Sequence, residues 1–531
     1  MFPRIASRSL TAAALVGFLA GGLLEDSLAH AQGGPGTPPK GAVGAPDGQP
    51  VPKAGPPAGE PAGDGQPDPS ADNPADNPAG QETGPVEKSP ENDSGDAADK
   101  DGEKGEKTGD KTGEGEGGKD EKKDTDARYG FGWAGLPLLN FNTDTGVGYG
   151  ARLVLFDYGK NQKPYKYRLL MQFYQSTGGL MFHRVSVDAP RLKGTKWRVD
   201  GNIRLDGDHL APYYGLGGQS EYNAAYETCA DRAALELNPD VCPGNPDFRG
   251  LRYYRYSLLL PAMDVNVRRD LRKPWQLMGG YSLQFAQIET QYPDELGQTT
   301  PSRLVEDLNN GEPLVGLENL DPNGNADLTR NGILQAGIVY DTRDNEPAPT
   351  GGAWHEFSLR AGSPVFGGNF WYWGAHLRLR AYAALDAARR LSVAGRLLFD
   401  VMGGDVPVYR LSRTGGLISK EVVGSGESVR GLLRARYVGK IKAIANAEIR
   451  WRFITVRPKG QRFDLTLVGG IDAGRAFRDF ADLDTKPLDG ALSTAGGLRI
   501  GWNENFVVRV DYGYSITDET TGFYIEFNHL Y

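Results

Sequence analysis

The sequence predicts an all-β protein, a 16-stranded antiparallel transmembrane β-barrel that is preceded by a disordered N-terminal tail. Three observations support this fold class. From Trp133 to Tyr531 the chain consists of stretches of about ten residues in which apolar and polar side chains alternate, the pattern of strands with one face in lipid and one in water. No stretch is apolar enough to cross a bilayer as a helix. The links between stretches are alternately short and long, as in barrels whose hairpins cross a membrane.

Residues 1–31 are expected to be a secretory signal peptide. Arg4 and Arg8 precede an apolar core from Leu10 to Leu24, and Ala29-His30-Ala31 offers small residues for cleavage before Gln32. Such a signal directs the chain out of the cytoplasm.

Residues 32–128 are predicted to be a disordered periplasmic tail. The segment is first rich in Pro and Gly and then carries a mixed-charge run of Gly, Asp, Glu and Lys. It has almost no aliphatic or aromatic residues, so it cannot bury enough apolar surface to offset the entropy lost on ordering. We expect a flexible tether, with passage through a cell-wall mesh as the functional alternative.

Residues 129–531 are predicted to form the barrel. The clearest strand runs from Ile441 to Phe453, where every second side chain is Ala, aliphatic or aromatic and most of the others are Lys, Asn, Glu or Arg. The expected strands are, in order, 133–142, 147–157, 165–176, 179–189, 196–206, 252–270, 275–289, 331–342, 352–361, 370–385, 391–402, 441–454, 462–474, 491–502, 505–515 and 522–531. The short links follow even-numbered strands, which places those links and both termini in the periplasm.

A soluble β-sandwich shows the same alternation, because its apolar face packs against a second sheet. The signal peptide, the even number of strands and the long loops after odd-numbered strands favour the membrane barrel. These loops span 206–250, 290–330 and 403–440.

The composition excludes several classes of function. A formal net charge of −9 argues against nucleic acid as a partner, and the six scattered His residues have no metal-ligand spacing, so we expect no cofactor and no metal. The segment Gly426-Glu427-Ser428-Val429-Arg430 lacks the last glycine of a G-x-S-x-G nucleophile elbow, and the chain is not expected to be an enzyme.

The two cysteines, Cys229 and Cys242, lie in one long polar connection of an exported chain. A disulfide that closes this loop is therefore the expected pairing, and a metal-binding or catalytic role is the alternative.

Three segments carry more than periodicity. The first is Tyr340-Asp341-Thr342-Arg343-Asp344-Asn345, followed by Pro349-Thr350-Gly351-Gly352 before the next strand. The second is Gly424-Ser425-Gly426-Glu427-Ser428-Val429-Arg430-Gly431 in the loop before the twelfth strand. The third is Gly470-Ile471-Asp472-Ala473-Gly474 in the thirteenth strand, with Ala495-Gly496-Gly497-Leu498-Arg499 in the fourteenth.

In this order, these segments resemble the outer-membrane assembly and translocation superfamily that includes BamA, TamA and the two-partner secretion transporters, also called the bacterial surface antigen family. The resemblance covers about residues 129–531. It implies that Asp341, Arg343, Asp344, Pro349 and Gly351 form a turn motif in the middle of the barrel. It also implies that Val429-Arg430-Gly431 is the tip of a loop inserted into the lumen, and that Asp472, which points inward by parity, holds Arg430 through a charge-assisted contact. Two unrelated solvated charges are the alternative.

The sequence also departs from this family. Leu432 stands where an aromatic residue follows the glycine, and Tyr531 stands at the end instead of Phe, although Phe523, Ile525 and Phe527 keep the outward alternation. The segment 32–128 lacks the apolar residues to build a periplasmic POTRA domain, which the assembly members carry.

We expect a bacterial outer-membrane protein that acts in outer-membrane protein assembly or in polypeptide or lipid translocation. The expected working part is a weak seam between the first and last strands, with Pro137, Phe527 and Tyr531, because Pro137 removes a ladder donor. The expected partners are outer-membrane lipids, client outer-membrane proteins or a periplasmic partner. A passive pore or structural surface barrel without a client is the alternative.

Overall fold

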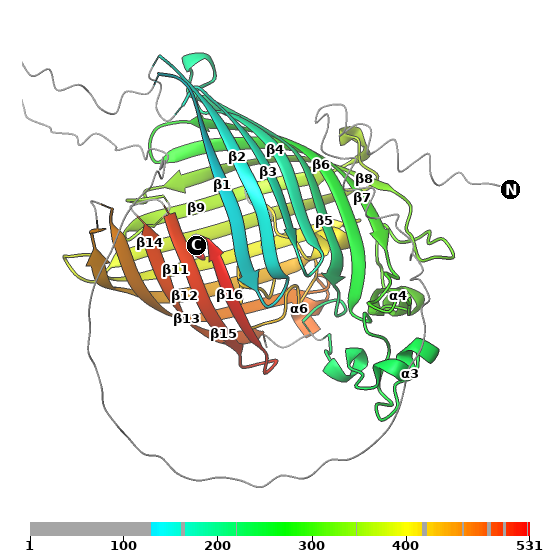
Figure 1. Cartoon of the computed structure of the whole chain (residues 1–531). Helices are drawn as coiled ribbons and strands as arrows, with labels where there is room; N and C mark the ends of the chain where they lie inside the picture. Colours follow the sequence, from blue (N-terminus) through cyan, green and yellow to red (C-terminus); the bar gives the residue numbers. More distant parts are fainter. Residues whose placement is uncertain are drawn as a thin grey trace, which may run out of the picture. The chain divides into compact units, whose positions relative to one another are not determined.

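The computed structural model describes residues 129–160, 165–218, 220–346, 348–416, 422–458, 461–485, 490–502, 506–527 and 529–531. The signal peptide and the tail predicted for residues 1–128 lie outside the described residues. Sixteen antiparallel strands form a closed barrel in which each strand pairs with its neighbours in sequence and β1 pairs with β16 (Figure 1). The predicted 16-stranded antiparallel barrel is therefore confirmed.

The strands follow the predicted ranges closely. Their bounds are β1 Tyr129–Asn142, β2 Gly146–Lys160, β3 Tyr167–Ser176, β4 Leu180–Ala189, β5 Trp197–Pro212, β6 Arg255–Asp270, β7 Trp275–Glu289, β8 Thr329–Asp341, β9 Gly352–Gly362, β10 Tyr372–Ala384, β11 Leu391–Gly404, β12 Ile441–Val456, β13 Phe463–Phe477, β14 Ala491–Trp502, β15 Phe506–Ser515 and β16 Thr521–Phe527. The prediction for the last strand needs correction, because β16 ends at Phe527 and not at Tyr531.

Alternation places the apolar side chains on the outside. In β12 and β13, Ile449, Trp451 and Ile471 are 50%, 52% and 56% exposed, whereas Arg450 and Asp472 on the opposite face are buried. Side chains of successive residues in a strand point to opposite faces, so the lumen receives the charged set. The apolar outer surface suits lipid.

Short helices lie on the loops: η1 Leu192–Gly194, η2 Ala224–Glu227, α3 Arg232–Leu237, α4 Arg303–Asn309, η3 Pro364–Phe366, α5 Val408–Leu411 and α6 Asp482–Thr485. None of the helices in the described part of the chain is both long and apolar enough to cross a bilayer.

The main apolar core lies at the end of the barrel that carries the long loops, where α3, α4 and α6 are seen in Figure 1. It joins Leu304 of α4 and Val408 of α5 to Leu260 of β6, Ile288 of β7 and Val438 before β12. The long loops thus pack on one another and on the strand ends, and they position the loop between β11 and β12.

Candidate functional site

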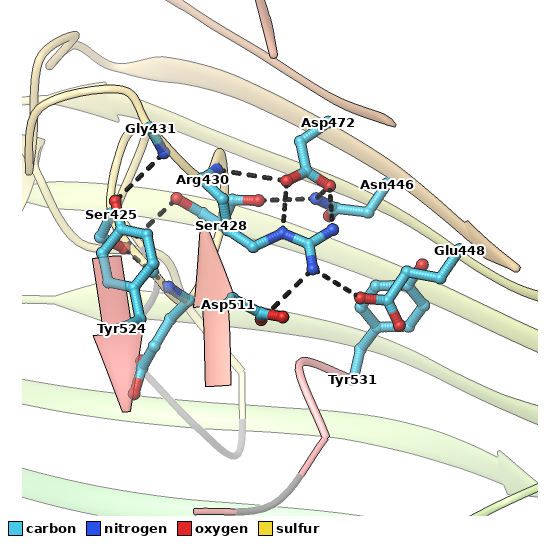
Figure 2. A network of polar contacts seen from close by, with 12 residues as sticks. Ser425, Ser428, Arg430, Gly431, Asn446, Glu448, Asp472, Asp511, Tyr524 and Tyr531 are labelled. Atoms are coloured by element: carbon cyan, nitrogen blue, oxygen red, sulfur yellow. Dashed lines mark hydrogen bonds and ion pairs between the residues drawn. The ribbon is translucent and has the colours of Figure 1, made fainter. Parts of the chain in front are cut away.

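The loop between β11 and β12 is described over 405–416 and 422–440, and its tip is Val429, Arg430 and Gly431. The tip lies against the lumen face of β12, β13 and β15, so Arg430 has no exposed side-chain surface. Figure 2 shows its guanidinium group pointing into a group of carboxylates from these strands.

Asp472 of β13 makes the most extensive contact with Arg430. The Arg430 Nε and Nη2 atoms donate to Asp472 Oδ2 and Oδ1 at 2.7 and 3.0 Å, and the backbone N–H of Arg430 also donates to Oδ2 at 3.2 Å. Two parallel N–H···O bonds to one carboxylate fix orientation as well as distance. The structure therefore brings the predicted partners together.

Two further carboxylates complete the surroundings of Arg430. Its Nη1 atom lies 2.8 Å from Glu448 Oε1 in β12 and 3.4 Å from Asp511 Oδ2 in β15. The excess negative charge is offset by Arg450, which binds Glu448 at 2.7 Å, and by Arg499, which binds Asp511 at 2.5 Å. The sequence analysis did not identify Glu448 and Asp511 as partners of Arg430, although their positions in the alternating pattern place both side chains in the lumen.

The tip can approach the wall because residue 431 is glycine. Gly431 has a φ of +89°, and a Cβ there would lie 2.5 Å from the backbone carbon of Gly513 in β15. Val429 and Leu432 are buried with Leu398, Val423 and Ile444 in a small apolar cluster. Leu432, the residue that departs from the family pattern, thus fills a packed site where apolar volume is needed.

The tip also touches β16, the last strand. The backbone N–H of Gly431 donates to the Tyr524 hydroxyl at 3.1 Å, and the Thr520 hydroxyl donates to the Gly431 carbonyl at 2.6 Å. Arg509 of β15 donates to the carbonyl of Gly426 at 2.9 Å and also forms an ion pair with Glu526 of β16. The loop and the last strand are therefore one bonded unit.

The seam between β1 and β16 is short. Among the residues that the structure describes, the register pairs only Phe141 with Ile525 and Asn142 with Tyr524, at the loop end, although β1 pairs with β2 over its whole length. Among the described residues, the part of the β1 edge that contains Pro137 has no β16 partner.

The other two residues predicted for the seam have different positions. Phe527 lies on β16, one of the two seam strands, and pairs on its other side with Val508 of β15. Tyr531 is buried in the lumen, where its hydroxyl donates to the Ala394 carbonyl at 3.1 Å and its ring lies 5.1 and 5.4 Å from the guanidinium carbons of Arg396 and Arg450. The inward arginines of β11 and β12 attract the aromatic ring away from the strand path.

A second charged cluster, which sequence reasoning missed, holds the other limb of the loop. Asp400 of β11 binds Arg360 at 2.8 Å and accepts from the backbone N–H of Gly415 at 2.8 Å. Lys442 of β12 donates to the carbonyls of Leu411 and Gly439 at 3.1 and 2.9 Å. The loop is therefore fastened at two separate places on the barrel wall.

The turn motif between β8 and β9 is held by its own side chains. Arg343 donates from Nε and Nη2 to Asp341 at 2.9 and 2.8 Å, and Asp344 accepts from the Thr350 backbone and hydroxyl at 3.0 and 2.6 Å. The backbone N–H of Asp344 donates at 3.2 Å to the carbonyl of Gly351, two residues after Pro349. These contacts make a structural turn.

Cys229 and Cys242 form a disulfide with a Cα–Cα distance of 5.7 Å. It packs against Leu235 of α3 and Phe248 in a small apolar cluster within the loop between β5 and β6. Within the described part of the chain, no group of three or more His, Cys, Asp and Glu residues has a geometry that would hold a metal ion.

The Omp85 superfamily domain matches residues 250–528 of the chain, which include the loop tip and Asp472. This match confirms the resemblance that the motifs indicated. Among solved structures, the chain is similar to BamA from Haemophilus ducreyi lacking POTRA domains 1–3, with 13% identity and a TM-score of 0.48 over 76% of this chain and 70% of that chain. It is also similar to CdiB from Escherichia coli, with 12% identity and a TM-score of 0.45 over 74% of this chain and 62% of that chain. A search of curated proteins found no match.

Proposed function

This chain belongs to the Omp85 superfamily and is a bacterial outer-membrane barrel, and from that premise we propose that it acts in outer-membrane protein assembly or in polypeptide or lipid translocation. The seam between β1 and β16 is its working part. The proposed partners are outer-membrane lipids and client outer-membrane proteins or a periplasmic partner. The proposed action is non-covalent and needs no catalytic residue.

The single observation that carries this proposal is the short pairing of β1 with β16. A strand edge without ladder partners presents free backbone N–H and C=O groups, which in a bilayer have no water to bind. Such an edge is costly unless another strand or a polar group occupies it. A barrel with one weak seam can therefore exchange its own pairing for that of a client.

The loop tip supports the same proposal, because it bonds to the strand on one side of the seam. Gly431 contacts Tyr524 and Thr520, while Arg430 holds the tip on β12 and β13. The tip would thus keep β16 in place while the edge of β1 moves.

A reversible lock across the seam tests the proposal. Phe141→Cys with Ile525→Cys places two thiols at a register pair on the lipid face, where opposite Cβ atoms in a sheet lie close enough to bridge. The chain is reconstituted in liposomes, and the folding of a urea-unfolded outer-membrane barrel added from outside is followed by heat-modifiable gel migration. We expect the oxidised lock to slow client folding several-fold and reduction to restore it.

A matched pair on the other side of β1 provides the control. Leu139→Cys with Tyr149→Cys bridges β1 to β2 on the same lipid face, and it leaves the seam free. Reduction also opens the native disulfide between Cys229 and Cys242 in every variant. The result is therefore the difference in client folding between the variant locked at 141 and 525 and the variant locked at 139 and 149. Equal client folding with the seam locked and unlocked would contradict the proposal.

The alternative, a passive pore or structural barrel, makes a different prediction in planar bilayers. An open pore would give large and steady currents, whereas a lumen occupied by the loop would give small and flickering ones. Large steady currents together with no acceleration of client folding would favour the pore.

A further inference from the structure

Two arginines on the lumen wall of β2 to β4 lack a carboxylate partner. Arg152 of β2 donates from Nε and Nη2 to Gln172 Oε1 in β3 at 3.0 and 2.8 Å. Arg184 of β4 is the register partner of Gln172, and its buried Nε has no acceptor. Within the described ranges, no carboxylate lies within ion-pair distance of either guanidinium group.

Neighbouring lumen arginines differ in this respect. Arg198 binds Asp188 at 2.8 Å and Arg268 lies 3.5 Å from Asp200. Asp206 attracts Arg184 from beyond ion-pair distance but is already bonded to Arg204. Arg152 and Arg184 are register partners of the same residue, Gln172, from its two sides, so their like charges face the lumen on one line across three strands. The positive charge of Arg152 and Arg184 is therefore not compensated by a carboxylate beside them. An anion bound between the two guanidinium groups would reduce their mutual repulsion.

The position of this pair links it to the seam. Arg152 is the register partner of Leu136 in β1, beside Pro137, in the part of the edge with no β16 partner among the described residues. On the lipid side of the same strand, Trp133 and Leu139 are 71% and 68% exposed. Arg152 thus lies one strand away from this edge of β1, and Arg184 lies three strands away.

We propose that Arg152 and Arg184, with Gln172 between them, bind a phosphate group that reaches the lumen at the seam, as the headgroup of an anionic lipid. A guanidinium fork matches a phosphate in two parallel hydrogen bonds, and two such forks match the charge of a phosphate monoester dianion. Binding at this site does not depend on a polypeptide client, so the binding experiment tests it separately from the proposed function.

Equilibrium binding to the full mature chain in non-ionic detergent, read by native mass spectrometry, tests the site. The probes are dioctanoyl phosphatidic acid, dioctanoyl phosphatidylcholine and inorganic phosphate. We expect phosphatidic acid to bind more tightly than phosphatidylcholine, and the double variant Arg152→Gln, Arg184→Gln to weaken its binding about tenfold or more. Tighter binding of phosphatidic acid than of inorganic phosphate assigns the site to a headgroup, and equal arginine-dependent binding of both assigns it to free phosphate.

The control is Arg268→Gln, which removes one positive charge from the same wall at an arginine that has a carboxylate partner. It should leave binding within about twofold of the wild type. Unchanged binding in the double variant, or an equal loss in Arg268→Gln, would overturn the proposal. Heat-modifiable migration verifies folding, and Arg152→Lys, which keeps the charge but loses the fork, should retain part of the affinity.

Discussion

The guanidinium group of Arg430 has no exposed surface and has therefore lost its hydration. Its contacts with carboxylates on three strands offset the free-energy cost of this desolvation. The desolvation of such a group costs several kcal/mol, so a buried pair adds little net stability when complete but is strongly destabilising when half is removed. Arg430 and its partners therefore act as a unit that specifies where the loop tip lies.

The unit can be dissected with a double-mutant cycle. Arg430→Ala leaves Asp472 buried without its main partner and should destabilise the seated loop by roughly 3 to 5 kcal/mol. Asp472→Asn should give a similar loss, and the double variant should be no worse than either single variant. Protease protection of the loop in folded protein measures the effect.

The control for this cycle is Arg389→Ala. Arg389 forms an ion pair with Asp344 at the surface, with 58% of its side chain exposed, so its loss should cost less than about 1 kcal/mol. Strictly additive losses at Arg430 and Asp472 would show that the two residues act separately.

At this scale the sequence predicts only part of the site. Inward parity and the family motif select Asp472, because both are local properties of one strand. The contacts of Glu448 and Asp511 depend on how β12 and β15 are staggered around the barrel and on the path of the loop, which are non-local. The alternation of side chains along each strand shows that both carboxylates face the lumen. It does not show that both contact Arg430.

At the scale of elements, the strands are the best-predicted feature, since a two-residue period is set by each strand alone. The end of β16 is the least well predicted. Tyr531 continues the alternation of Phe523, Ile525 and Phe527, yet it leaves the sheet for Arg396 and Arg450, which lie on strands far away in the sequence. No local pattern distinguishes these two outcomes.

The turn between β1 and β2 should make the loop sensitive to pH. Burial raises the pKa of Asp144 to about 6, although the charge of Arg434 and the backbone N–H of Gly426, both in the loop, lower it. Because the folded-state pKa is raised, protonation of Asp144 stabilises the folded state below about pH 4, and this contribution is lost as the pH rises through 6. The two-unit shift corresponds to at most about 3 kcal/mol.

We therefore expect loop protection from protease to be greater at pH 4.5 than at pH 7.5 in the wild type. Asp144→Asn should flatten this dependence, because the amide does not titrate. An Asp144→Asn variant with the same pH profile as the wild type would show that another group is responsible.

At the scale of the whole molecule, we propose that the barrel folds without residues 32–128. The composition of that segment offers too few apolar residues to pack on anything. Deletion of the segment should leave heat-modifiable migration and the thermal midpoint of the barrel unchanged within error. A truncated chain that fails to fold in membranes would reveal a role that composition does not predict.

The contacts of the loop tip also set an order of events during biogenesis. Arg430 bonds to residues 42 and 81 positions later in the chain, and Gly431 to one 93 positions later. Contacts of such long sequence separation form late, because the intervening hairpins must close first. Until then Asp472 has to remain hydrated, since it cannot be desolvated without a cation, whereas Glu448 and Asp511 have Arg450 and Arg499 beside them on the barrel wall. The nascent barrel must therefore keep water in its lumen until its last strands are in register, and the arrival of Arg430 marks the completion of that process.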